Sequence, residues 1–460
     1  MTCTLEKHSN VLDQKAKKTI RKALKVLGKK NLAFIMHNGS FPAAQNQNTG
    51  FGSINSDGGK EFIEYASGLF DAIQLGPAGK TKSCDSSPYT GTIFSDNPLF
   101  INLKELTTKD WGKILSENTY NEIINDNPNK DVNKTAYSYA YKRYSEALQE
   151  AWNNFKANPV KKLEKEFEHF KRENSFWLDK DSLYEALSIE HGNDYWPLWN
   201  SETDKNLFNP QSIEQKMQFA ERIKEIENKY SDEIELYKFT QFIISKQNEE
   251  TRKFAKKHDI KMIADRQVAF SDRDTWAYQA LFLKGWCLGC PPDYFSKTGQ
   301  RWGFPYYDPE KIFNKDGSLG EAGKIMQQKY EEYFASFPGG IRIDHIIGLI
   351  DPFIYTNSSK KMTASNSGRI YSIFSGKYKK KNDDEYANIL TKIIIPAAKK
   401  HGLSKDAIIC EDLGDRNLPT ERVMKKLGLS GISVTQFDHR GAKAPERNLL
   451  MPGSHDNQSF

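Results

Sequence analysis

The sequence lacks a long apolar segment. No stretch of its 460 residues approaches the roughly 20 consecutive apolar residues that a membrane-spanning helix needs. Residues 7–30 place apolar side chains at helical spacing among lysines, without the continuous apolar stretch and cleavage site of a secretory signal. These absences predict a cytoplasmic protein with no membrane partner, whose first 30 residues form a basic helix on the surface.

Cysteine is also scarce. The five cysteines form an odd and scattered set, unlike the dense, even-numbered pattern of a disulfide framework. Cys287 and Cys290 have the spacing of half a zinc site, but no second Cys or His pair stands nearby to complete four ligands. We therefore expect reduced thiols and no metal.

An excess of one charge is missing as well. The chain has 66 basic and 60 acidic residues, and its densest basic run, at 377–381, is followed at once by acids, as in a solvated loop. This balance argues against a nucleic-acid partner. What the sequence does contain, 38% hydrophobic and 12% aromatic residues, is enough to build a packed core.

Seven short apolar runs, several of them nearly continuous, predict buried parallel strands. Helical patterns lie between most of the runs, for example at 248–259 and 386–402, and alternating strands and helices indicate an α/β fold. Seven strands suit a (β/α)8 TIM barrel with insertions better than an open sheet. The runs are 32–37, 71–77, 260–270, 340–346, 407–414, 431–437 and 448–456.

The chain is expected to have four parts. Residues 1–30 form the basic helical segment, and residues 31–109 begin the barrel with strands 1 and 2. Residues 110–239 contain long, charged, aromatic-rich helical patterns and no convincing strand, which predicts a helical insertion between strands 2 and 3. Residues 240–460 continue the barrel with strands 3–7 and the active-site loops.

Ionisable residues stand at the ends of three predicted strands. Side chains alternate along a strand, so Arg342 and Asp344 face one side and His345 the other. Glu411 and Asp456 end two later runs. Carboxylates at the carboxyl ends of several barrel strands are typical of a catalytic site.

These carboxylates suit the cleavage of a glycosidic bond, in which one attacks the sugar and another protonates the departing oxygen. A third would raise the pKa of the acid, and Arg342 would hold Asp344 ionised. Structural alternatives remain open: a buried ion pair for Arg342 with Asp344, a helix N-terminus for Glu411 with Asp412, and a turn pair for His455 with Asp456.

Residues 291–309 supply flat aromatic faces on which a sugar could stack, although the same residues could form the core of a loop. We favour the sugar platform because of the neighbouring carboxylates. The aromatic residues are Tyr294, Phe295, Trp302, Phe304, Tyr306 and Tyr307.

Several motifs resemble those of the 4-alpha-glucanotransferases, the amylomaltase or disproportionating-enzyme family of the alpha-amylase clan. "PPDYFSKTGQRWG" is the most diagnostic, and "GGIRIDH", "EDLG" and "PGSHDN" follow in the same order as in the family. The resemblance implies a (β/α)8 barrel, no required cofactor, and retaining transfer of α-1,4-glucan segments between maltooligosaccharides. It makes Asp344 the nucleophile, Glu411 the general acid/base and Asp456 the transition-state stabiliser. The implied substrate-binding residues are Tyr89, Asp265, Gln300, Trp302, Arg342 and His455.

Four positions depart from the family pattern. Ile346 and Ile347 replace an aromatic residue and an arginine, Phe304 replaces an asparagine, and Gln267 replaces a proline. These changes bear on subsite affinity and acceptor choice more than on the chemistry, because Asp344 and the other two catalytic carboxylates remain.

The family also continues beyond "HDN", so we expect the sequence to be a fragment or a truncated product. Two alternative functions stay open: an α-glucan hydrolase of the same clan, and an inactive glycan-binding protein.

Overall fold

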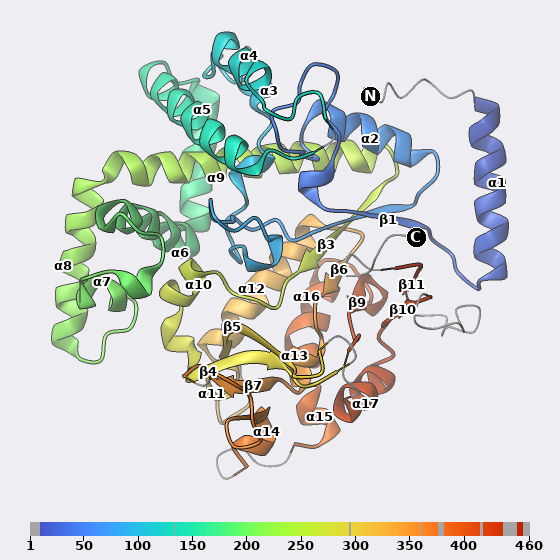
Figure 1. Cartoon of the computed structure of the whole chain (residues 1–460), viewed down its shortest axis with the longest axis vertical. Coiled ribbons are helices and arrows are strands. Elements are labelled where there is room, and N and C mark those ends of the chain that lie inside the picture. The colour runs from blue at the N-terminus through green and yellow to red at the C-terminus, as the bar shows by residue number, and fades with distance from the viewer. Residues whose placement is uncertain are drawn as a thin grey trace. The chain divides into compact units, whose positions relative to one another are not determined.

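The computed structural model describes residues 10–132, 134–293, 296–358, 360–375, 381–414, 417–435 and 449–453, with side chains from residue 14 onward. The chain divides into two compact units, and Figure 1 labels most of their helices and strands. Unit 1 comprises residues 1–14, 34–260 and 270–280, and unit 2 comprises residues 15–33, 261–269 and 281–460. Helix α1 (Asn10–Val26) crosses the boundary between them.

Unit 1 is mainly helical, and between residues 110 and 239 every described regular element is a helix. Its strands are β1 (Ala33–Met36) and β2 (Ala72–Leu75). Its helices are α2 (Asp57–Ser67), α3 (Leu103–Leu106), α4 (Glu117–Asn125), α5 (Tyr137–Ala157), α6 (Lys161–His191), α7 (Glu202–Asn206), α8 (Ile213–Lys229), α9 (Ser231–Lys257) and α10 (Asp272–Ala277). Short 3₁₀ turns are η1 (Asn38–Ser40), η2 (Pro88–Thr90), η3 (Pro98–Phe100), η4 (Trp196–Leu198) and η5 (Gln279–Leu281).

An aromatic cluster forms the core of unit 1. Phe155 of α5, Phe167 of α6 and Phe239 of α9 are all buried, and the rings of Phe155 and Phe239 stack with centroids 4.5 Å apart. Burying each phenylalanine contributes about 1.5–3 kcal/mol. The cluster therefore explains why three long, highly charged helices pack together.

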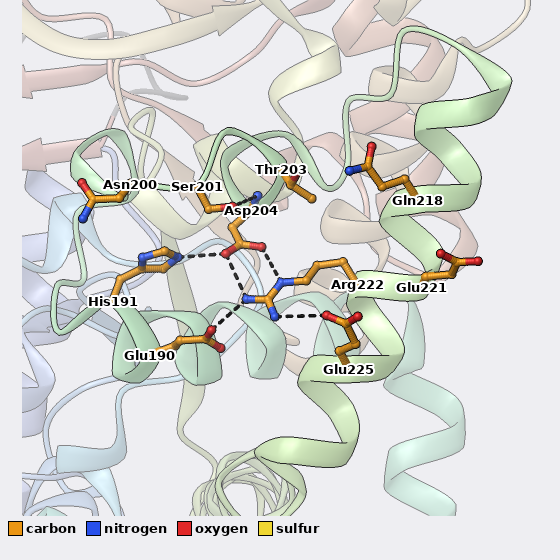
Figure 2. A pocket seen from close by; sticks show the side chains of 10 residues that line it. All are labelled: Glu190, His191, Asn200, Ser201, Thr203, Asp204, Gln218, Glu221, Arg222 and Glu225. Atoms are coloured by element: carbon orange, nitrogen blue, oxygen red, sulfur yellow. Dashed lines mark hydrogen bonds and ion pairs between the residues drawn. The ribbon is translucent and has the colours of Figure 1, made fainter.

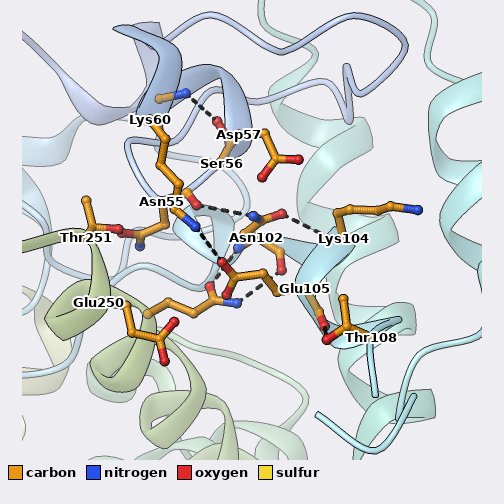
Figure 3. A network of polar contacts seen from close by, with 12 residues as sticks. Asn55, Ser56, Asp57, Lys60, Asn102, Lys104, Glu105, Thr108, Glu250 and Thr251 are labelled. Atoms are coloured by element: carbon orange, nitrogen blue, oxygen red, sulfur yellow. Dashed lines mark hydrogen bonds and ion pairs between the residues drawn. The ribbon is translucent and has the colours of Figure 1, made fainter. Parts of the chain in front are cut away.

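A buried amide network fastens the segment before α3 to helix α9. The Gln247 side chain accepts the Asn102 N–H at 2.8 Å and donates to the Asn102 carbonyl at 3.1 Å, as a neighbouring strand would. Asn55 donates to Asn248 at 2.8 Å and accepts from Thr251 at 2.7 Å. Figure 3 shows the network around Asn55 and Asn102. The side chains of α9 thus satisfy a buried backbone outside regular structure.

Replacing Gln247 by Ala should lower the free energy of unfolding by about 1–3 kcal/mol, because the Asn102 N–H loses its partner in the interior, whereas the Asn102 carbonyl keeps the Glu105 N–H at 3.2 Å. Chemical denaturation followed by circular dichroism measures this. The matched control is Gln218→Ala at an exposed position of α8, which should change stability by no more than about 0.5 kcal/mol. Equal effects of the two variants would contradict the prediction.

Unit 2 combines sheets with shorter helices. Its strands are β3 (Lys261–Arg266), β4 (Phe282–Cys290), β5 (Gln300–Tyr307), β6 (Ile341–Ile343), β7 (Phe353–Thr356), β8 (Ser367–Arg369), β9 (Ile408–Cys410), β10 (Ile432–Val434) and β11 (Leu449–Met451). Its helices are α11 (Pro309–Ile312), α12 (Glu321–Ser336), α13 (Ile347–Ile350), α14 (Ile370–Ile373), α15 (Asp383–Tyr386), α16 (Ile395–Lys400) and α17 (Leu418–Leu427), with a π-helix, η6 (Leu390–Ile394), and a 3₁₀ turn, η7 (Lys405–Ala407).

All seven predicted strands occur in the chain, with shorter bounds, as β1, β2, β3, β6, β9, β10 and β11. In unit 2, β6 lies between β3 and β9 and pairs parallel with both. Strands β10 and β11 form a separate parallel pair. The predicted α/β fold with a parallel sheet is therefore confirmed.

A second sheet in unit 2 was not predicted. Strands β5, β4, β7 and β8 are neighbours in that order, and all three pairings are antiparallel (Figure 1). Strand β5 covers much of the aromatic stretch that the sequence suggested was a loop. Gly303 and Pro305 interrupt the strand pattern of β5, and the other partner of β4, β7, lies more than sixty residues away in the sequence.

No helix in the described part of the chain is long and apolar enough to cross a membrane.

Candidate active site

The parallel pairing in unit 2 brings four predicted site residues together. Asp265 of β3 lies opposite Arg342 of β6, and Ile343 lies opposite Cys410 of β9. Asp344 and Glu411 are the next residues along β6 and β9. Because parallel strands end at the same edge of a sheet, these two carboxylates leave the sheet side by side.

Arg342 joins two carboxylates. Its Nη1 lies 2.8 and 3.0 Å from the two oxygens of Asp265 and 3.0 Å from Oδ1 of Asp344. The Asp265 side chain is only 2% exposed, whereas that of Asp344 is 18% exposed. The sequence suggested an ion pair of Arg342 with Asp344 alone; the structure adds Asp265 as a buried anchor. The guanidinium therefore has a fixed position from which it stabilises the charge of the more accessible Asp344.

Glu411 is held by backbone donors. Its Oε2 accepts the His345 N–H at 2.8 Å, and its Oε1 accepts the Leu413 N–H at 2.7 Å. Burial, and to a smaller extent the Asp344 charge, raise the pKa of the Glu411 carboxyl to about 7, against the lowering effects of Arg342 and the two N–H groups. Charge repulsion, the cause expected from the sequence, is therefore the smaller of the two. An ion-paired carboxylate beside a carboxyl that keeps its proton near neutrality is what acid-assisted displacement at a sugar carbon requires.

Trp302 and Gln300 lie along β5 beside this group. The Trp302 ring meets His345 edge to face, with centroids 4.8 Å apart, and its Nε1 donates to Gln300 Oε1 at 3.1 Å. His345 directly follows Asp344, the nucleophile candidate, and its N–H binds Glu411. Trp302 therefore packs against the residue that connects the two carboxylates.

The aromatic residues of β5 form two groups that differ in exposure. Trp302 and Phe304 stack at a centroid distance of 5.9 Å and are half-buried. Tyr306 is 4% exposed, and Tyr307 is buried against Phe282 with centroids 5.1 Å apart. Alternation along β5 explains part of this division, since Trp302 and Phe304 share one face of the strand.

Three of the four residues that depart from the family pattern are buried. Ile346 and Ile347 are 0% and 3% exposed, and Gln267 is 2% exposed. Isoleucine is suited to these positions because α13 begins there and packs inward. Only Phe304, next to Trp302, retains a partly accessible side chain.

Five further predicted residues lie in unit 1 or outside the described residues. Tyr89 belongs to turn η2 of unit 1, where its ring centroid lies 5.9 Å from that of His37. His455, Asp456, Tyr294 and Phe295 lie outside the described residues.

The described residues of unit 2 include residue types that bind metals. No group of three or more His, Cys, Asp or Glu side chains within the described ranges could hold a metal ion. Cys287 and Cys290 are buried in β4 and form no disulfide, and the Cys290 thiol lies 3.4 Å from Oδ2 of Asp293.

A polar pocket of about 540 Å³ lies in unit 1, lined by residues of α6, α7 and α8 (Figure 2). At its base Asp204 accepts hydrogen bonds from Arg222 Nε at 2.8 Å and pairs with His191 Nε2 at 3.0 Å. Arg222 also reaches Glu190 at 3.0 Å and Glu225 at 3.4 Å. Because Arg222 pairs with carboxylates of three helices, the pocket is a structural junction and a weaker active-site candidate than the carboxylates of unit 2.

Comparison with known proteins identifies the family of the chain. A family model described as 4-alpha-glucanotransferase matches residues 37–460. The chain is 26% identical to the 4-alpha-glucanotransferase of Clostridium butyricum, covering 87% of this chain and 75% of the relative. It is 26% identical to the chloroplastic/amyloplastic enzyme of Solanum tuberosum, covering 94% and 70%. The amylomaltase from Streptococcus agalactiae, solved in complex with acarbose, has the same fold, with a TM-score of 0.73 at 20% identity over 93% of this chain and 80% of that one. Because the family model matches most of the length of this chain, the chain belongs to the 4-alpha-glucanotransferase family.

Proposed function

We propose that this protein transfers α-1,4-glucan segments between maltooligosaccharides with retention of configuration, through a covalent glycosyl-enzyme on Asp344. The observation that carries the proposal is the pair of adjacent strand ends. One carboxylate is ion-paired to Arg342, and the other, Glu411, has a pKa of about 7. An ion-paired carboxylate next to a carboxyl that keeps its proton near neutrality matches a nucleophile and a general acid.

The reaction has two steps. In the first, the Asp344 carboxylate forms a bond to the anomeric carbon while the glycosidic bond breaks, and Glu411 gives its proton to the departing oxygen. In the second, Glu411 removes a proton from the acceptor hydroxyl, whose oxygen attacks the anomeric carbon and releases Asp344. Glu411 ends protonated and Asp344 ionised, so the site is ready for another cycle.

Arg342 and Asp265 prepare Asp344 for attack. Asp265 fixes the guanidinium, and the guanidinium keeps Asp344 ionised and oriented toward the sugar. From the family resemblance we propose Asp456 as the stabiliser of the transition state. We likewise propose that Tyr89, Gln300, Trp302 and His455 line the donor and acceptor subsites.

We infer that the parallel strands belong to a (β/α)8 barrel, which the likeness to the amylomaltase supports. Residues 31–109 and 240–460 would form the barrel, residues 110–239 its helical insertion, and residues 1–30 a basic segment. We also propose a cytoplasmic location, which is supported by the absence of a disulfide at Cys84, Cys287 and Cys410.

Incubation of the purified chain with maltotriose tests the function. Transfer yields glucose together with a ladder of longer maltooligosaccharides, whereas hydrolysis yields only shorter products. Binding of maltotriose without turnover would instead indicate an inactive glycan-binding protein. Either of the last two outcomes would contradict the proposed function.

Activity should depend on pH through Glu411. Because Glu411 must carry a proton to act as an acid, kcat/KM for maltotriose should fall as pH rises through about 7. Initial rates of glucose release between about pH 5 and 9 measure this limb. A kcat/KM that stays constant up to pH 9 would exclude Glu411 as the essential acid.

A further inference from the structure

The backbone at His345 has an unusual conformation. Its φ is +44°, in the left-handed region that residues other than glycine seldom adopt. The next residue, Ile346, is right-handed, with φ −55° and ψ −27°. A left-handed residue followed by a right-handed one turns successive N–H groups toward the same side and creates a concavity that binds anions.

Both N–H groups of this concavity bind Glu411. The His345 N–H donates to the Glu411 Oε2 at 2.8 Å, and the Ile346 N–H donates to the Glu411 carbonyl at 2.9 Å. The Glu411 N–H returns a bond to the Ile343 carbonyl at 2.9 Å. The turn that carries the chain away from Asp344 is therefore the same turn that holds the general acid.

The imidazole of His345 packs against Trp302. Its ring meets Trp302 edge to face, and its Nε2 is buried without a hydrogen-bond partner among the described residues. Gly348 leaves room for it, since a Cβ at that position would lie 3.0 Å from His345 Cδ2. Burial lowers the pKa of the ring to about 4, so a neutral imidazole lies beside Asp344 and adds no competing cation.

We propose that His345 is a positioning residue for glucan transfer, whose left-handed backbone directs the His345 N–H to the Glu411 carboxyl and the Ile346 N–H to the Glu411 backbone carbonyl. The inference rests on the proposed function. It predicts that the backbone conformation at this position matters more than the imidazole.

A glycine–alanine pair separates these contributions. His345→Gly and His345→Ala both remove the ring, but only alanine carries a Cβ that opposes a φ of +44°. We expect kcat for maltotriose to be about tenfold lower in the alanine variant than in the glycine variant, with KM nearly equal. The N–H bond favours the ionised carboxylate, so its loss should move the alkaline limb of kcat/KM to higher pH in the alanine variant alone.

Two further measurements keep the proposal testable. If His345→Ala does not fold, His345→Asn replaces it in a comparison with His345→Val. Asparagine tolerates the left-handed region and should behave like glycine, whereas the β-branched valine should not. Carbon-13 NMR titration of Glu411, assigned by its loss in Glu411→Gln, reports the carboxyl pKa without turnover. That titration therefore tests His345 even if the chain gives no ladder from maltotriose.

Equal kcat values and equal pH limbs in the glycine and alanine variants would overturn the proposal. A glycine variant as impaired as alanine would do the same, because it would assign the role to the imidazole. An unchanged Glu411 titration in His345→Ala would also contradict it.

Discussion

Replacing Asp344 by Asn should lower kcat for maltotriose transfer by about 10⁴-fold or more, since the amide cannot form the glycosyl ester. The substitution keeps the shape of the side chain, and Arg342 retains its contacts of 2.8 and 3.0 Å with Asp265. The variant should therefore fold normally and still bind maltotriose. Product chromatography and a binding titration measure the two effects separately.

A matched control is Asp316→Asn, which removes a carboxylate from an exposed turn and should leave kcat within about twofold. Residual transfer by Asp344→Asn within tenfold of the unmodified chain would exclude Asp344 as the nucleophile. Asp265 is not an alternative nucleophile, because its side chain is 2% exposed and both its oxygens are bound to Arg342.

Glu411→Gln should give the second largest effect, a loss of about 10³-fold in kcat for maltotriose, because no proton reaches the departing oxygen. The loss should depend on the leaving group. Fluoride departs without protonation, so α-maltosyl fluoride should still form the glycosyl-enzyme at a substantial rate. Single-turnover fluoride release measures that first step.

Leu418→Ala, at an exposed position near the start of α17, serves as the control and should behave like the unmodified chain on both donors. Equal losses on maltotriose and α-maltosyl fluoride would show that Glu411 acts through structure and not as an acid.

Stability offers an independent check on Glu411. Its carboxyl pKa is about 7 in the folded chain, against an ordinary value of 4.5. The folded state therefore retains a proton that the unfolded state loses, and this group's contribution to stability declines as pH rises from 4.5 toward 7. Denaturation of the Glu411→Gln variant should lack this part of the pH dependence.

The sequence predicts the parts of the molecule that depend on local pattern. Apolar runs identified β3, β6 and β9, because buried parallel strands need apolar side chains on both faces. Alternation placed Arg342 and Asp344 on one side, and both take part in the same ion-paired group.

The remainder depends on contacts that local pattern does not encode. The antiparallel sheet escaped prediction because β4 pairs with β7 across a long separation and β5 contains glycine and proline. Asp265 is the partner of Arg342 because of the register between β3 and β6. The apolar pattern of one strand does not predict its register with another. The left-handed turn at His345 was not predicted. Side chains alternate only within the strand, and β6 ends at Ile343, two residues before His345. A histidine alone does not indicate a left-handed turn, although histidine adopts positive φ more often than most residues.

The most direct test of the central claim is to trap the glycosyl-enzyme. Glu411→Gln incubated with a fluorinated maltosyl fluoride should accumulate an adduct, because loss of the base slows the second step. Proteolysis and mass spectrometry should then locate the sugar on the peptide that contains Asp344. A label on any other carboxylate, or turnover without an adduct that yields products of inverted configuration, would contradict the account.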